Sequence, residues 1–433
     1  MLTVAPAELL RELIRFDTSN PPGNERACIE HVATLLREAG IDFQTYGARP
    51  ERPNLVARLA GSGRRPGLVL QGHVDVVTTA NQRWTYPPFQ AHIAEGFIWG
   101  RGALDMKNGV AMMVSAFLRA KRENIPLPGE VILCLLVDEE AGGVEGAEWL
   151  VANQPDLFQG VRYTIGEGGG YSFMAGGRRF YSVMVSEKRG CQLKVTLRGP
   201  GGHGSLPMRG GAMAKLGQLL VKLDSARLPV HLTPPVRLML EAMRDSLGGE
   251  LGERYGGLLD PARADSLLDR MGADGRSFDA ILHNTVNATI VEGGLKINVI
   301  PSAVAVELDG RLLPGFGPED LISEVRALIG EEAEIEVVRL GPAQPELDLS
   351  GLEVLSQILR ELDPEGIPVP YLVSGATDGR HFAELGIRTY GFTPVRLPDG
   401  FDAWSTIHDA DERIPVDGLD LGTEAIYQAI LRL

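Results

Sequence analysis

The most apolar segment of the chain runs directly into three acidic residues. Residues 131–137 are seven apolar side chains in succession, and Asp138, Glu139 and Glu140 follow without a spacer. Seven residues are too few to span a bilayer but suffice for a buried β-strand. Carboxylates at the end of such a strand are costly unless a cation or water satisfies them. The sequence therefore predicts a polar or cation-binding site at this strand end.

Apolar strand segments alternate with amphipathic helical segments in the first part of the chain. Strands are predicted at 54–59, 67–77 and 130–137, and helices at 9–16, 26–39, 106–122 and 146–153. The pattern resumes late in the chain with a helix at 351–362, a strand at 367–373 and a helix at 418–431. Such alternation is typical of an α/β domain, whose functional groups collect beyond the carboxyl ends of the strands.

The middle of the chain has a different pattern, which begins near residue 188. Strands are predicted at 191–198, 285–291, 303–308 and 334–340, and helices at 211–223 and 318–329. Their order, β-α-β-β-α-β, is that of a ferredoxin-like unit. A largely helical insert, at about 231–283, interrupts this unit. We therefore predict a first domain in two parts, 1–187 and 343–433, with a smaller domain, 188–342, inserted between them.

Charge and cysteine content exclude several classes of protein. A net charge of −15 over 433 residues leaves no basic surface for phosphates or anionic lipid, so we expect neither nucleic acid nor a membrane as partner. The three cysteines are far apart and lack C-x-x-C spacing, which favours free thiols in a reducing compartment. The first 16 residues contain acids where a signal peptide needs a basic flank. We expect a cytoplasmic protein.

Two further segments place polar residues at the ends of predicted elements. In Gly72-His73-Val74-Asp75, residues two apart on a strand share a side, so Asp75 can orient one ring nitrogen of His73 while the other binds a metal. Asp105 stands in a glycine-rich turn before a helix. Taken singly, His-x-Asp is more often a surface pair, and Asp105 could be a helix N-cap. Their occurrence together with residues 138–140 favours a divalent metal, for which His, Asp and Glu are suitable ligands.

Four segments together resemble, in order along the chain, the co-catalytic zinc amidohydrolases. They are DTSNPPGNE at 17–25, GHVDV at 72–76, WGRGALDMK at 99–107 and DEEAGG at 138–143. That family contains aminoacylase, acetylornithine deacetylase, succinyl-diaminopimelate desuccinylase and carboxypeptidases G and S. The resemblance covers nearly the whole chain. It implies a zinc-peptidase-like α/β catalytic domain that carries an inserted ferredoxin-like lid and dimerisation domain.

The resemblance implies two divalent metal ions, Zn²⁺ or, alternatively, Co²⁺ or Mn²⁺. Asp105 would bridge the two ions. His73 and Glu167 would complete one site, and Glu140 and His408 would complete the other.

The resemblance also assigns roles next to the metals. Glu139 would take a proton from the attacking water and deliver it to the leaving nitrogen, and Asp75 would orient His73. His203, in the glycine-rich segment 199–207, would stabilise the oxyanion, often from the partner subunit. Without the other motifs, this segment would be only a turn.

Four more residues match substrate-binding positions of the family. Asn298 and Arg311 would grip the substrate carboxylate, since an arginine can hold a carboxylate through two parallel hydrogen bonds. We expect a β-hairpin to bring Asn298 and Arg311 toward the same cleft; the alternative is that Arg311 pairs with a surface acid. Gly375 and Thr377 match a loop on the substrate side, although Ala376 stands where a second glycine is frequent.

The expected function is hydrolysis of the amide bond of N-acyl amino acids or small peptides that bear a free carboxylate, by a homodimer joined through its lids. Two alternatives remain open: an aminopeptidase of related fold, or a catalytically silent metal-binding homologue. The remaining histidines are not expected to bind metal; they are His31, His92, His231, His283 and His381.

Overall fold

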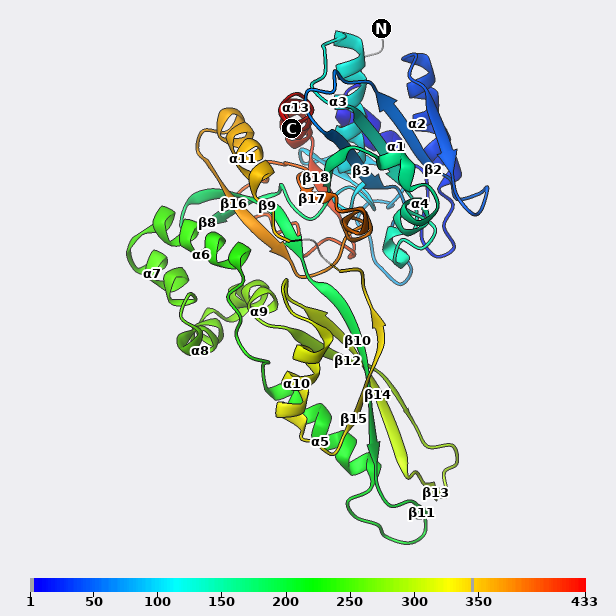
Figure 1. Ribbon diagram of the computed structural model, residues 1–433, viewed down its shortest axis with the longest axis vertical. Coiled ribbons are helices and arrows are strands. Elements are labelled where there is room, and N and C mark those ends of the chain that lie inside the picture. Colours follow the sequence, from blue (N-terminus) through cyan, green and yellow to red (C-terminus); the bar gives the residue numbers. More distant parts are fainter. Residues whose placement is uncertain (1–3, 344–345) are drawn as a thin grey trace. The chain divides into compact units, whose positions relative to one another are not determined.

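The computed structural model describes residues 4–343 and 346–433 and divides them into two compact units (Figure 1). Unit 1 contains the described residues of 1–186, 344–371 and 377–433. Unit 2 contains residues 187–343 and 372–376, so it is inserted in the sequence between parts of unit 1.

Unit 1 is built on a mixed sheet in the order β1-β2-β6-β3-β7-β17-β9-β16, with β8 paired to β9. The central neighbours β6, β3, β7 and β17 run parallel, whereas β1, β2 and β9 pair antiparallel. A smaller sheet has the order β18-β5-β4. The strands are β1 (Phe43–Tyr46), β2 (Asn54–Leu59), β3 (Gly67–His73), β4 (His92–Ala94), β5 (Phe97–Trp99), β6 (Val131–Leu136), β7 (Val161–Gly166), β8 (Ser172–Ala175), β9 (Arg178–Glu187), β16 (Gly366–Val373), β17 (Arg388–Gly391) and β18 (Arg413–Pro415).

Helices cover both faces of this sheet. Alternate residues of the buried strand β6 face opposite layers: Leu133 and Leu135 pack into the larger core, whereas Ile132 and Cys134 pack into the smaller one. The larger core includes α1 (Pro6–Ile14), α2 (Arg26–Glu38), α3 (Lys107–Glu123), α11 (Ser350–Leu362) and α13 (Gly418–Arg432), and the smaller one includes α4 (Ala147–Asn153) and α12 (Gly379–Phe382). The continuous apolar pattern of β6 follows from this burial on two faces.

A buried lysine joins the start of α3 to the end of α1. Lys107 Nζ donates hydrogen bonds to the main-chain oxygens of Leu13 (3.0 Å) and Phe16 (2.8 Å). Burial lowers the pKa of Lys107. The lysine thus satisfies carbonyl groups that the helix end leaves unpaired.

Unit 2 contains an antiparallel sheet in the order β12-β14-β10-β15, with α5 and α10 in its core. In chain order this is the β-α-β-β-α-β arrangement of a ferredoxin-like fold. A two-stranded ladder, β11 and β13, lies at one end of it (Figure 1). The elements are β10 (Arg189–Arg198), β11 (Gly202–His203), α5 (Ala212–Ser225), β12 (Thr285–Gly293), β13 (Val299–Ile300), β14 (Ala303–Leu312), α10 (Pro318–Ile329) and β15 (Glu334–Leu340).

Four helices occupy the expected insert in unit 2. They are α6 (Pro234–Leu247), α7 (Gly249–Gly257), α8 (Pro261–Met271) and α9 (Arg276–Leu282). Lys188 Nζ ties the end of this insert to the sheet through hydrogen bonds to the main-chain oxygens of Ala280 and His283 and to Thr285 Oγ1. Among the described residues, no helix is long and apolar enough to cross a membrane.

The predicted fold class is confirmed, and the differences lie mostly at element ends. The strand predicted at 67–77 ends at His73 as β3, because Val76 pairs instead with Ser19. The predicted strand 303–308 extends four residues further, to Leu312. Several strands were not expected from the sequence, since they are short or partly polar; they are β1, β4, β5, β7, β8, β9, β11, β13, β17 and β18.

Candidate metal centre

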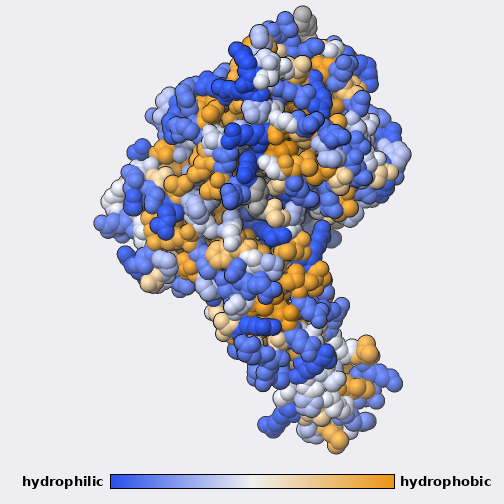
Figure 2. Space-filling view, viewed as in Figure 1, coloured by the Kyte–Doolittle hydropathy of each residue, from blue (hydrophilic) through white to orange (hydrophobic). Residues whose placement is uncertain are grey.

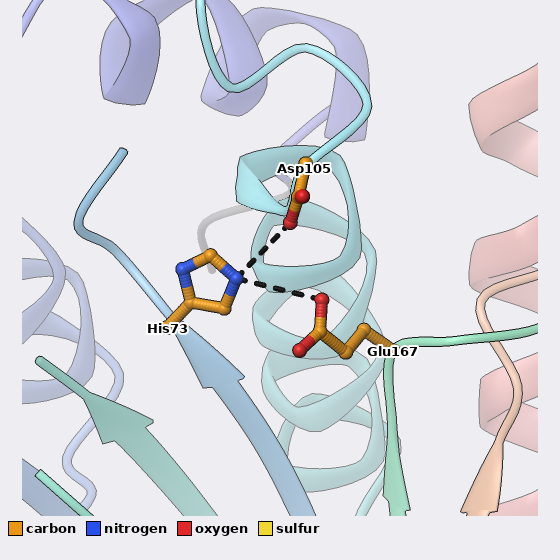
Figure 3. A group of neighbouring side chains, drawn as sticks. All are labelled: His73, Asp105 and Glu167. Carbon is orange, nitrogen blue, oxygen red and sulfur yellow. Dashed lines mark hydrogen bonds and ion pairs between the residues drawn. The ribbon is translucent and has the colours of Figure 1, made fainter. Parts of the chain in front are cut away.

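Neighbouring parallel strands carry polar side chains to one edge of the unit 1 sheet. β3 ends at His73, β6 leads into residues 138–140, and β7 leads into Glu167. Because β6 and β7 flank β3 and run parallel to it, their carboxyl ends lie at the same edge. Asp105 reaches this edge from the turn before α3 (Figure 3).

His73, Asp105 and Glu167 form one group of ligand atoms (Figure 3). His73 Nε2 lies 3.1 Å from Asp105 Oδ1 and 3.5 Å from Glu167 Oε2. Its Nδ1 lies 3.0 Å from the main-chain oxygen of Asp75, which can only accept, so in the neutral ring Nδ1 carries the proton. Nε2 then presents a lone pair to two carboxylates, an arrangement that needs a proton or a cation between them.

Asp105, Glu140 and His408 form a second group. His408 Nε2 lies 3.1 Å from Asp105 Oδ2 and 3.2 Å from Glu140 Oε2. Asp105 thus offers one oxygen to each group. The side chain of His408 is 51% exposed, whereas that of His73 is 1% exposed.

The two groups fit divalent metal ions. Ligand atoms held at about 2.0–2.2 Å around a tetrahedral ion lie about 3.3–3.6 Å apart, and the nitrogen–oxygen distances in the two groups are 3.1–3.5 Å. Glu140 Oε1 is buried and has no hydrogen-bond partner among the described residues. A cation would satisfy that oxygen and balance the converging carboxylates.

The pKa values record how strongly these groups affect one another. Burial opposes ionisation of Asp105, but hydrogen bonds from His408 and His73 outweigh it and hold its pKa well below the usual range. Burial, reinforced by the charge of Asp105, raises the pKa of Glu140, and burial raises that of Glu167 to about 7. Hydrogen bonds to Asp105 and Glu140 raise the pKa of His408 to about 10. The carboxylates of the two groups therefore favour positive charge at this edge of the sheet, as the ligands of a metal ion do.

Asp75 holds this edge together in a way that differs from the expectation. Its carboxylate Oδ1 is 3.6 Å from His73 Nδ1, and the ring bonds instead to its main-chain oxygen. The carboxylate accepts the main-chain N–H groups of Glu139 (3.1 Å) and Glu140 (3.2 Å) and the Asn20 amide (2.9 Å). Asp75 therefore fixes the loop after β6 as well as the ring of His73.

Glu139 lies near both groups without belonging to either. Its side chain is 12% exposed, and its Oε1 is 3.6 Å from a guanidinium nitrogen of Arg380. Burial, with the negative charge of Glu167, raises the pKa of Glu139 well above its usual value. A carboxylate with a raised pKa near a reaction centre is suited to accept and return a proton.

A buried ion-pair network behind this loop was not predicted. Arg52 donates to Glu25 at 3.0 Å and to Asp138 at 2.8 Å, and the Asn20 amide also donates to Asp138 at 3.0 Å. Asp138 has a left-handed backbone, with φ of 69°. Three successive acids do signal that a counter-charge is needed, but nothing in the spacing points to Arg52.

Glu412 is a second buried acid that sequence reasoning missed. Its carboxylate accepts the main-chain N–H groups of Gly102 (3.0 Å), Leu104 (2.6 Å) and Asp105 (3.0 Å), together with Arg101 at 2.6 Å. It therefore supports the turn that presents Asp105. Four acids lie in the segment 402–412, and their spacing does not reveal which of them is buried.

His203 and Asn298 lie next to each other in unit 2. His203 is in β11, which pairs with β13, and the N–H of Gly204 donates to the main-chain oxygen of Asn298 at 2.9 Å. His203 Nδ1 accepts the main-chain N–H of Ser205, so the neutral ring carries its proton on Nε2. That N–H is available as a donor.

Arg311 does not join Asn298, which corrects the expected hairpin arrangement. Arg311 is in β14, opposite Thr285, eight residues beyond the start of the strand, whereas Asn298 precedes that start. At roughly 3.3 Å per residue, Arg311 lies about 26 Å along the strand from its start at Ala303. The Arg311 guanidinium instead pairs with Asp309 at 2.9 Å and 3.1 Å.

Gly375 and Thr377 fall in different units. Gly375 belongs to unit 2, and a Cβ added there would meet only Val373 Cγ1 at 3.8 Å. Thr377 belongs to unit 1, is buried, and accepts the N–H of Gly379 through its hydroxyl at 3.1 Å.

The other histidines take structural contacts in the described residues. His31 bonds to Glu12, His231 to Glu324 and His283 to Asp265, and His92 stacks on Tyr86. His381 is buried in α12, 3.7 Å from Glu384. None of them is in either group of ligand atoms that the described residues form.

Solved structures share the fold. Human carnosine dipeptidase 1 matches 98% of this chain and 96% of its own, with 16% identity and a TM-score of 0.64. A metallo-carboxypeptidase from Sulfolobus solfataricus matches 99% and 98%, with 16% identity and a TM-score of 0.66. A Bacillus subtilis protein described as a dinuclear metal binding peptidase matches 98% and 96%, with 14% identity and a TM-score of 0.63.

Sequence relatives cover most of the chain. A probable carboxypeptidase S-like 2 of Dictyostelium discoideum is 27% identical over 84% of this chain and 71% of its own. The human N-fatty-acyl-amino acid synthase/hydrolase PM20D1 is 26% identical over 84% and 73%, and human aminoacylase-1 is 26% identical over 94% and 90%. Residues 69–432 match the family model of Peptidase family M20/M25/M40. The predicted family and enzyme class are confirmed, and the protein belongs to this family of peptidases.

Proposed function

We propose that the protein hydrolyses the amide bond of N-acyl amino acids or small peptides that bear a free carboxylate, with two metal ions. One observation carries the proposal: Asp105 offers its two oxygens to two separate groups, each completed by a histidine and a glutamate, with Glu139 beside them. Relatives named as an aminoacylase, a carboxypeptidase S-like protein and an N-fatty-acyl-amino acid hydrolase support this substrate class.

The proposed ligands follow the two groups. His73 and Glu167 would hold one ion, Glu140 and His408 the other, and Asp105 both. When bound, two such ions would lower the pKa of the attacking water and polarise the substrate carbonyl. We propose Zn²⁺, with Co²⁺ or Mn²⁺ as alternatives, because nitrogen and carboxylate ligands suit these ions.

The protein's own side chains would handle the protons. Glu139 accepts a proton from the attacking water and passes it to the leaving nitrogen. The raised pKa of Glu139 favours its protonated form once the proton is taken up. Asp75 keeps Glu139 in place through the main-chain N–H of Glu139, and it holds the ring of His73 through its own main-chain oxygen.

We propose that His203 and Asn298 act on the active site of a second copy of the chain, in a homodimer joined through unit 2. The Nε2–H of His203 would donate to the developing oxyanion. Hydrophobic residues are exposed near these two residues, as Figure 2 shows at the end of unit 2 where Figure 1 labels β11 and β13. They are Leu206, Leu295, Ile297 and Val299. Exposed apolar groups of this kind favour burial against a partner.

Recognition of the substrate carboxylate is assigned to Arg311, which would exchange Asp309 for the substrate. We propose that Gly375 and Thr377 also contact the substrate, Gly375 through its main chain and Thr377 through its hydroxyl. A cytoplasmic location is also proposed. It is supported by the three cysteines, which are buried and free.

Metal-free protein reconstituted with Zn²⁺, Co²⁺ or Mn²⁺ tests the function. We expect hydrolysis of N-acyl amino acids and dipeptides, and discrimination against the same substrates with the carboxylate converted to a primary amide. A requirement for a free substrate amine would identify an aminopeptidase instead. Two bound ions without hydrolysis of any substrate in the panel would identify a silent homologue.

A further inference from the structure

The loop between β3 and β4 in unit 1 contacts the loop that carries His408, and the proposed function leaves it without a task. The side chain of Gln82 makes three hydrogen bonds in this contact. Its Nε2 donates to the main-chain oxygen of His408 at 2.8 Å. Its Oε1 accepts from Arg101 at 2.9 Å and from the Trp84 indole at 3.2 Å.

Two residues of the His408 loop have a left-handed backbone, and each is bound by the segment 82–85. His408 has φ of 64° and Asp411 has φ of 61°. This conformation is less costly for Asp and His than for most residues with a Cβ, but it is still uncommon, and surrounding contacts help to hold it. Gln82 holds the main-chain oxygen of His408, and Thr85 donates its N–H (2.7 Å) and hydroxyl (2.8 Å) to the carboxylate of Asp411.

The same glutamine is linked to the turn that presents Asp105. Arg101, which donates to Gln82, also donates to Glu412 at 2.6 Å. Glu412 in turn accepts the main-chain N–H of Asp105 at 3.0 Å. Glu412 binds the Asp105 turn directly through three main-chain N–H groups, so this turn does not need Gln82, whereas the main-chain oxygen of His408 is bound by Gln82 itself.

The two histidines differ in how the fold holds them. His73 ends a central strand that pairs with β6 and β7, and its side chain is 1% exposed. His408 is in a loop, and its side chain is 51% exposed. A ligand on a loop depends on contacts outside its own segment to keep the geometry that a metal requires.

We propose that Gln82 and Thr85 form a latch that positions His408, so that the metal site of His408 and Glu140 depends on this latch and the site of His73 and Glu167 does not. Of the proposed function, this proposal assumes only that the protein binds two metal ions. Both residues act through the His408 loop and are positioning residues. Contacts that orient metal ligands typically account for about 10- to 100-fold in metal affinity.

The test uses Gln82→Glu and Thr85→Val in the full-length protein. Gln82→Glu retains an acceptor for Arg101 but replaces the donor to His408 with an oxygen, and Thr85→Val removes one of two donors to Asp411. Gln90→Ala, at an exposed glutamine of the same loop, is the matched control. Metal-free proteins are titrated with Co²⁺ by absorption and with Zn²⁺ against a competing chelator, and thermal unfolding verifies that each variant is folded.

We expect Gln82→Glu to raise the Kd of one of the two ions by about 10- to 100-fold. The Kd of the other ion, and both Kd values of the control, should not change. Thr85→Val should raise the Kd of the same ion by a smaller factor. Adding Gln82→Glu to Glu140→Gln should cost little further affinity, because both changes affect the same site. Equal weakening of both ions, unchanged affinities, or a wild-type protein that binds only one ion would overturn the latch. A wild-type protein that binds two ions but hydrolyses no substrate would refute the proposed function alone, since the latch is judged on affinity.

Discussion

The metal centre of unit 1 and the pair His203 and Asn298 of unit 2 are supported in opposite ways. His73 ends a central strand, and Glu140 and Glu167 follow two others, in a sheet that helices cover on both faces. His203 is exposed in a two-residue strand, with Asn298 just before the partner strand. The first site is assembled within one unit by its fold, whereas among the described residues neither His203 nor Asn298 belongs to a group of metal-ligand atoms. The comparison indicates that the first region depends on the core of its own unit, whereas the second can change with little effect on packing.

The largest expected effect tests the metal centre of unit 1. Glu139→Gln should lower kcat by roughly 10²- to 10⁴-fold while both metal ions are retained, because it removes the general base and no ligand. Turnover and metal content are measured on the same preparations. Glu148→Gln, in the neighbouring helix α4, is the control and should leave both unchanged. If Glu139→Gln lost metal and Glu140→Gln kept it, the two roles would be reversed.

The next effect tests whether unit 2 contributes to chemistry. His203→Ala should lower kcat by roughly 10²- to 10³-fold with little change in thermal unfolding, since an exposed residue contributes little to the core and an oxyanion donor is worth about that much. Mixed dimers of His203→Ala and Glu139→Gln chains should regain part of the activity if the histidine serves the partner. No recovery in mixed dimers of verified composition would show that each chain uses its own His203.

A smaller effect tests recognition by the other end of β14. Arg311→Ala should raise KM for N-acyl amino acids by about 10- to 100-fold, which corresponds to the roughly 1.5–3 kcal/mol of a hydrogen bond to a charged group. The activity toward primary-amide analogues should not change. Arg339→Ala, at an exposed arginine of the same unit, is the control. Equal losses of activity with acid and amide substrates would show that Arg311 does not bind the substrate carboxylate and only pairs with Asp309.

Sequence reasoning predicted the two regions unequally, for physical reasons. The apolar run of β6 and the positions of His73 and Asp105 could be placed on elements because a buried strand and an amphipathic helix impose strict periodicity. Glu167 followed from the resemblance, since β7 is partly polar and gave no clear pattern. Glu412, Arg52 and Gln82 were missed because their partners are distant in sequence. Periodicity also could not fix the end of β14, so Arg311 was expected near Asn298.

The last prediction concerns stability, and its pH dependence should distinguish unit 2 from unit 1. Burial, with the charge of Arg311, lowers the pKa of Lys188 to about 7, against partial compensation by Asp279 and Asp309. The unfolded chain therefore binds more protons at this site than the folded chain between about pH 7 and the ordinary lysine pKa, near 10.5. Stability rises with pH where the unfolded state binds more protons, so this group lowers the free energy of unfolding as the pH falls from 10.5 to 7. Lys188→Met should reduce that slope, measured by denaturant unfolding between pH 7 and pH 9. Lys107→Met, in unit 1, is the control and should not affect the same transition if the units unfold separately. An unchanged slope in Lys188→Met would show that the three oxygens around Lys188 keep it charged.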